Sequence, residues 1–73
     1  MTISVGSHVE FADATSGRTD AFTLVHPSDG APSEGRLSVA SPVARALLGH
    51  EPGDTITVAL PHGARRLRVL SVA

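Results

Sequence analysis

Only one segment of this 73-residue chain has the pattern of an α-helix, and it spans no more than Ser41 to Leu48. Ser41 is suited to accept a hydrogen bond at the helix N-terminus, Pro42 fits the first helical position, and Gly49 can adopt the left-handed backbone that ends a helix. The apolar residues between them recur at i,i+4 spacing and form one stripe, consisting of Val43, Ala44, Leu47 and Leu48. Because one short helix provides so little apolar surface, strands must supply the rest of the core.

The remaining apolar residues alternate with polar ones, which is the pattern of half-buried strands. This alternation predicts strands at residues 5–12, 18–26, 36–40, 55–60 and 65–72. Phe11 and Phe22 fall on the apolar faces of the first two strands, so both rings are expected in the core. The last strand has two apolar pairs on opposite faces, Leu67 with Val69 and Leu70 with Val72.

Turn-forming residues separate these segments. Residues 13–17 connect the first two strands as a hairpin, residues 27–35 form a surface loop, and Glu51 to Asp54 suit a type II turn. The order of elements is therefore β-β-β-α-β-β. It predicts the α+β class, with a curved antiparallel five-stranded sheet packed on one short helix, in a single domain over residues 1–73.

Composition excludes several kinds of protein. Cysteine is absent, so no disulfide or thiolate metal site supports the fold. No apolar run approaches the length of a membrane span and no secretory signal is evident, so a cytoplasmic protein is expected. The net charge is −1, so the chain lacks the excess of positive charge that is typical of domains that bind nucleic acids directly. The one basic cluster, Arg65, Arg66 and Arg68, is expected to be a solvated strand face.

No pattern of catalytic, cofactor-binding or metal-ligating residues is present, so the chain is not expected to be an enzyme. The nucleophile elbow of hydrolases is missing, and the glycines fit neither phosphate-binding loop. The histidines fall beside turns or on exposed strand faces, without the i,i+4 helical spacing of a metal pair, at His8, His26, His50 and His62.

The most informative segment is LSVASPVARALLG, residues 37–49. It resembles the signature of the C-terminal domain of Gre-type transcription elongation factors. The matching residues are Leu37, Ser38, Val39, Ser41, Pro42, Val43, Ala44, Arg45, Ala46, Leu47, Leu48 and Gly49. The flanking segments also resemble that family, namely Val5-Gly6-Ser7, residues 22–27, Gly35, Pro52-Gly53-Asp54 and Pro61-His62-Gly63. The likeness therefore covers nearly the whole chain, about residues 4 to 72.

The resemblance implies an FKBP-like fold and a role in docking. In that family the domain binds RNA polymerase at the β′ subunit coiled coil, on the rim of the secondary channel. A separate N-terminal coiled coil carries the acidic residues that hold the metal ion for transcript cleavage. No heptad pattern occurs here, so we expect the docking half without the catalytic half, as a stand-alone protein or an excised domain.

The expected partner-binding residues are Ala40, Ser41, Pro42 and Arg45. Ala40 departs from the family, which commonly has Asp or Asn there, and His50 stands where Lys is common. Three functions remain open: a polymerase-docking domain that competes with full-length cleavage factors, an interaction module for another protein, and a prolyl isomerase. The last lacks support, because an isomerase pocket is lined by aromatic rings and both Phe residues are placed in the core.

Overall fold

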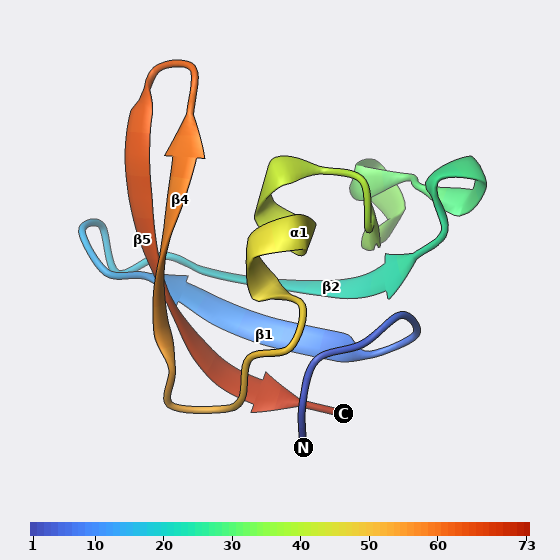
Figure 1. Cartoon of the computed structure of the whole chain (residues 1–73), viewed down its shortest axis with the longest axis horizontal. Coiled ribbons are helices and arrows are strands. Elements are labelled where there is room, and N and C mark those ends of the chain that lie inside the picture. Colours follow the sequence, from blue (N-terminus) through green and yellow to red (C-terminus); the bar gives the residue numbers. More distant parts are fainter.

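The strands form one sheet in the order β3-β2-β1-β5-β4, and a single α-helix packs on one of its faces (Figure 1). The computed structural model describes all residues from 1 to 73. The elements are β1 (His8–Asp13), β2 (Thr19–Val25), β3 (Arg36–Ser38), α1 (Pro42–Leu47), β4 (Thr55–Leu60) and β5 (Gly63–Val72). The predicted α+β class and the β-β-β-α-β-β order are confirmed.

The helix begins and ends where its sequence signals predicted. Ser41 is the N-cap residue with extended backbone angles, and Pro42 occupies the first turn. Gly49 has a φ of 84°, the left-handed conformation that residues other than glycine rarely adopt. The turn at Glu51 to Asp54 closes with a backbone hydrogen bond of 3.1 Å, and Gly53 has the positive φ that a type II turn requires.

One strand pairing differs from the prediction of a wholly antiparallel sheet. β3 runs parallel to β2, with Leu24 opposite Leu37, so the sheet is mixed. The cause lies in residues 26–35, because a parallel neighbour needs a connection long enough to carry the chain back along the preceding strand. Here the connection contains two short 3₁₀ turns, Pro27–Asp29 and Pro32–Glu34, in place of a tight hairpin.

The end of β5 also differs from strict alternation. Glu10 pairs with Ser71 but Phe11 pairs with Val69, so the register shifts by one residue and Leu70 is left opposite no partner. A β-bulge of this kind inserts one extra residue and reverses the facing of everything beyond it. Val72 therefore packs against the core, while Leu70 is exposed, and the prediction that these two share a face is wrong.

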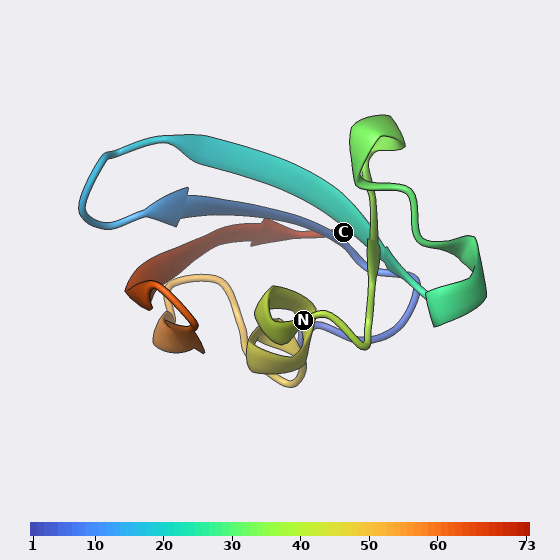
Figure 2. The same cartoon turned by 90° about the horizontal axis from the view of Figure 1, so that it is seen from above.

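The core lies between α1 and the concave face of the sheet. Viewed from above, the sheet arches over α1 and its opposite face stays uncovered (Figure 2). The helix contributes Ala44 and Leu47, both fully buried, and Phe11 stacks on Phe22 with ring centroids 6.2 Å apart. The strands also supply the buried side chains of Val9, Leu24, Ile56, Val58, Leu67 and Val69. None of the helices has both the length and the apolar character needed to cross a membrane.

The first residues close the core at the C-terminal end of α1, which the sequence reading did not anticipate. Ile3 is 2% exposed. Its backbone N–H donates to the carbonyl of His50 at 2.9 Å, and its carbonyl accepts from the N–H of Gly49 at 2.9 Å. The segment before β1 thus pairs with the chain that leaves the helix and holds that end of α1 in place.

A second long-range tie fixes the β1–β2 turn. Asp13 accepts hydrogen bonds from the backbone N–H groups of Thr15 and Ser16 at 2.8 and 3.0 Å, and from Nε of Arg65 on β5 at 3.1 Å. The two backbone donors, followed by Arg65, hold the pKa of the Asp13 carboxyl below its usual value. The ionised carboxylate therefore closes the turn and links it to the last strand.

Leu47→Ala should lower the free energy of unfolding by about 2–5 kcal/mol, because the substitution opens a cavity where the helix meets the sheet. Leu70→Ala removes the same atoms from an exposed position, so it should change stability by about 0.5 kcal/mol or less. Urea denaturation monitored by circular dichroism measures both. Equal midpoints for the two variants would contradict the placement of α1 over the core.

Stability should fall in acid, because the pKa of Asp13 is lowered in the folded state. A lowered pKa stabilises the fold at pH values above the usual carboxyl pKa, and this contribution is lost from about pH 5 downward. Asp13→Asn should reduce Tm at pH 7 and flatten its decline in acid. Asp29→Asn, which changes an exposed carboxylate in a loop, is the control and should leave the decline unchanged. A wild-type slope retained in Asp13→Asn would contradict this role.

Candidate partner-docking corner

A tight corner joins β3 to α1 and carries the four residues that the sequence singled out: Ala40, Ser41, Pro42 and Arg45. Ser38, the last residue of β3, builds the corner from its backbone and its side chain. Its carbonyl accepts from the N–H of Ser41 at 3.0 Å, and its hydroxyl accepts from the N–H of Ala40 at 3.0 Å. These two bonds fix the direction in which the helix leaves the sheet.

Ser41 stabilises the corner through hydrogen bonds to the first turn of α1. Its hydroxyl oxygen accepts from the N–H of Ala44 at 3.3 Å, and its carbonyl accepts from the N–H of Arg45 at 2.9 Å. The side chain thus satisfies a backbone donor that the first helical turn leaves free. Ser41 is half-buried, so its main contribution is to hold its neighbours in position.

The exposed part of the corner consists of Ala40, Pro42 and Arg45. Arg45 follows the buried Ala44 and projects from the side of the helix away from the core. Its guanidinium takes part in none of the ion pairs of the protein, which join Arg36 to Glu34, His50 to Asp54 and Arg65 to Asp13. The corner therefore presents a rigid proline and one unpaired positive charge.

The other candidate residues of the sequence are dispersed. No group of three or more His, Asp or Glu side chains lies close enough to hold a metal ion. His8 contacts Thr23, and His50 contacts the Asp54 carboxylate at 3.1 Å. The backbone N–H of Glu51 and then His50 hold the pKa of Asp54 below its usual value, so this pair stabilises the turn after the helix.

The basic cluster of β5 is divided between the two faces of the sheet. Arg65 lies opposite the buried Val58 and shares the concave face with Leu67, whereas Arg66 lies opposite the exposed Thr57. Arg68 shares the outer face with Arg66. Strand alternation thus separates residues that are adjacent in sequence, and the prediction of one solvated face holds only for Arg66 and Arg68.

Comparison with known proteins identifies the family. The profile described as "Transcription elongation factor, GreA/GreB, C-term" matches residues 1–73, the whole chain. The chain belongs to the GreA/GreB family. The segment that resembles the family signature, residues 37–49, forms the end of β3, the corner and α1.

Individual GreA proteins are identical to this chain at about a third or more of the aligned residues. The transcription elongation factor GreA of Nitratidesulfovibrio vulgaris is 44% identical over 71 residues, covering 97% of this chain and 44% of that protein. GreA of Limosilactobacillus fermentum is 34% identical over 70 residues, covering 96% of this chain and 44% of that protein. The chain thus spans less than half the length of these curated relatives.

Solved GreA/GreB-family structures agree with the fold. GreA factor homolog 1 of Thermus thermophilus superposes with a TM-score of 0.83 at 35% identity, covering all of this chain and 49% of that one. The elongation factor GreA/GreB from Nitrosomonas europaea superposes with a TM-score of 0.77 at 35% identity, covering 97% and 59%. The curved five-stranded sheet with one short helix is therefore the fold of this domain in the family.

Ser41→Ala should lower the free energy of unfolding by about 1 kcal/mol, because it removes the N-cap acceptor of the only α-helix. Ser33→Ala changes an exposed serine whose hydroxyl makes no hydrogen bond, so it should leave stability nearly unchanged. Thermal melts of both variants measure the difference. A Tm for Ser41→Ala as high as that of Ser33→Ala would mean that the cap contributes nothing to the corner.

Proposed function

We propose that this domain docks on RNA polymerase through the corner formed by Ala40, Ser41, Pro42 and Arg45. The proposed partner is the coiled coil of the β′ subunit at the rim of the secondary channel. The observation that carries the proposal is the family's Ser-Pro-helix motif, which forms an exposed corner at one end of α1. A protein bound there would compete with full-length Gre factors for the same site on the polymerase.

The chemistry of the corner suits a helical partner with acidic side chains. The guanidinium of Arg45 is exposed and unpaired, and a guanidinium grips a carboxylate through two parallel N–H···O bonds. Pro42 adds a stiff apolar surface that loses little conformational entropy on binding. The apolar stripe of α1 is consumed by the core, so the contact depends on the exposed corner residues.

The contact is expected to be weak and sensitive to salt. Ala40 replaces the polar residue common in the family, so the corner lacks one donor or acceptor for the partner. The remaining interaction depends on an exposed charge, which dissolved ions screen. A corner of a few residues also falls well below the area that stable protein interfaces bury.

We propose further that the 73 residues have no enzymatic activity and act in the cytoplasm, where the polymerase is found. The family resemblance implies that transcript cleavage depends on acidic residues of a separate coiled-coil domain. The 73 residues do not contain that domain. The net charge of −1 gives no support to direct nucleic-acid binding. Docking alone is therefore the activity proposed for this domain.

Arg45→Glu should weaken binding to purified RNA polymerase at least about threefold at low salt, because it replaces the attraction of an exposed charge pair with repulsion. Arg66→Glu makes the same charge change on the uncovered face of the sheet and should bind like the wild type. Biolayer interferometry with immobilised polymerase, at low and high salt, measures all three proteins, and circular dichroism verifies that each is folded.

The outcomes of this experiment separate the two binding hypotheses. Equal affinities for wild type and Arg45→Glu at low salt would exclude the corner as the interface. Failure of the folded wild type to bind polymerase at any salt concentration would overturn the polymerase proposal and favour a different protein partner.

A polypeptide of these 73 residues, added to backtracked elongation complexes, should not shorten the transcript beyond a buffer control. Added in excess together with a full-length Gre factor, it should slow the cleavage that the factor stimulates, because both compete for one docking site. Gel analysis of labelled transcripts measures both effects. Transcript shortening by the domain alone would contradict the proposal that it only docks.

A further inference from the structure

A polar hollow opens on the concave face of the sheet, where the core ends toward the β1–β2 turn. It has a volume of about 370 Å3, and no apolar side chain lines it. Its lining consists of Asp13, Ser16, Arg18, Asp20 and Arg65. The helix is too short to cover this part of the concave face, so charged side chains take the positions that apolar ones occupy beneath α1.

Strand register explains why these side chains meet. Asp20 lies opposite Phe11 on β1, and Asp13 follows Phe11 at the next position on the same face. Asp13 in turn lies opposite Leu67 of β5, two residues from Arg65. The hollow thus continues the core-facing side of three neighbouring strands, and residues distant in sequence converge on it.

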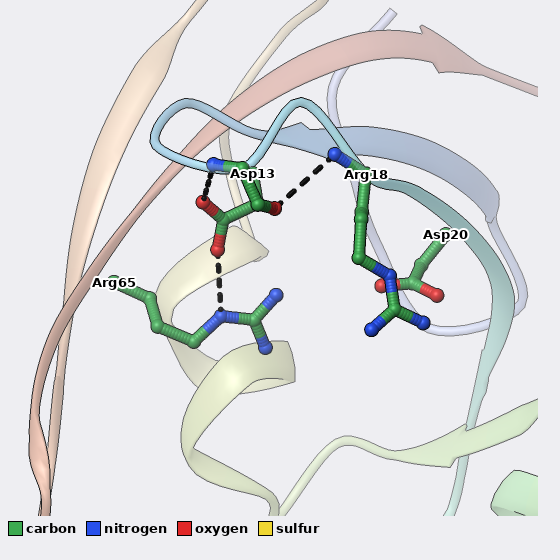
Figure 3. A pocket seen from close by; sticks show the side chains of 5 residues that line it. Asp13, Arg18, Asp20 and Arg65 are labelled. Carbon is green, nitrogen blue, oxygen red and sulfur yellow. Dashed lines mark hydrogen bonds and ion pairs between the residues drawn. The ribbon is translucent and has the colours of Figure 1, made fainter.

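Arg65 is held in place but keeps most of its hydrogen-bonding capacity. Its Nε donates to Oδ2 of Asp13 at 3.1 Å, whereas its two terminal nitrogens have no partner in the protein. Oδ1 of Asp13 already accepts two hydrogen bonds from backbone N–H groups, so the carboxylate is held by the turn as well as by Arg65. The contact fixes the direction of the guanidinium and leaves its terminal nitrogens free toward the hollow (Figure 3).

Arg18 projects into the hollow from the other side, immediately before β2. Figure 3 shows its guanidinium across the hollow from that of Arg65, and Asp20 lines the same hollow. The guanidinium of Arg18 forms no hydrogen bond or ion pair with Asp20 or with any other residue, whereas its backbone N–H donates to Oγ of Ser16 at 3.2 Å. Two guanidinium groups with free N–H donors therefore converge on one open space.

We propose that this hollow binds a carboxylate side chain from an acidic segment of a partner protein, held between the guanidinium groups of Arg18 and Arg65. The planar N–H donors of a guanidinium match the two oxygens of a carboxylate. The site lies apart from the Arg45 corner in sequence and does not depend on which protein that corner binds.

The charges around the hollow favour a single carboxylate over a polyanion. Asp13 and Asp20 stand in the same lining, so a doubly charged phosphate meets more repulsion than a singly charged carboxylate. The chain as a whole carries a net charge of −1, which disfavours a nucleic-acid backbone. The opening to solvent lets a side chain enter while its backbone remains outside.

Nuclear magnetic resonance tests this site without knowledge of the natural partner. A ¹⁵N-labelled sample is titrated with a hexaglutamate peptide, with hexaglutamine as the uncharged control and inorganic phosphate as a second anion. The Arg65 Nε–H signal is a direct probe, because its hydrogen bond to Asp13 slows exchange with water. We expect hexaglutamate to shift this signal and the backbone signals of residues 13–20 in a saturable manner, and hexaglutamine to leave them unchanged.

Matched variants test whether Arg18 and Asp20 of the hollow affect peptide binding. Arg18→Gln should raise the Kd for hexaglutamate about threefold or more, as expected for an exposed charge pair. Arg66→Gln makes the same change on the opposite face of the sheet and should leave the Kd unchanged. Asp20→Asn should lower the Kd, because it removes a carboxylate that repels the ligand.

The proposal fails if Arg66→Gln weakens binding as much as Arg18→Gln, because the peptide would then respond to net charge alone. Shifts confined to residues outside the hollow would also overturn it. Stronger binding of phosphate than of hexaglutamate at the same signals would refute the carboxylate assignment. Circular dichroism verifies that each variant is folded.

Discussion

The burial of Ala44 and Leu47 beneath the arched sheet is the interaction on which the rest of this structure depends. One helix of six residues packs on the concave face of five strands, and the sheet curls around it so that the helix covers the apolar part of that face. The positions of both helix ends follow from this packing. The Ser-Pro corner lies where the chain leaves β3, and the other end is closed by Ile3, whose backbone pairs with Gly49 and His50.

The short length of α1 also explains why the concave face of the sheet has an apolar part and a charged part. Beneath α1 the concave face is apolar, but beyond the reach of the helix the same strand positions carry charged side chains, including Asp13 and Arg65. Strand alternation sends Arg66 to the opposite, uncovered face. Both proposed sites therefore follow from the packing of one short helix on a larger sheet. The docking corner lies where β3 joins the helix, and the carboxylate site lies on the concave face beyond the helix.

Local sequence signals predicted the helix, its caps and most strands, because those features depend on residues close together in the chain. Features that depend on contacts between distant residues could not be predicted in this way. The parallel pairing of β3 depends on how residues 26–35 fold back, and the bulge at Leu70 depends on pairing between β1 and β5. The contact of Arg65 with Asp13 joins residues 52 positions apart, so the hollow became visible only in the structure. The motif residues of the corner were found from the sequence because they are contiguous.

The central claim is that the corner at the start of α1 faces RNA polymerase. A photo-crosslinking amino acid placed at position 45 tests it most directly, with the same amino acid at position 66 as the control on the opposite face of the sheet. We expect position 45 to crosslink to the β′ subunit, within its coiled coil, and position 66 not to do so. Crosslinking to that coiled coil from position 66 alone, or equally from both positions, would contradict it.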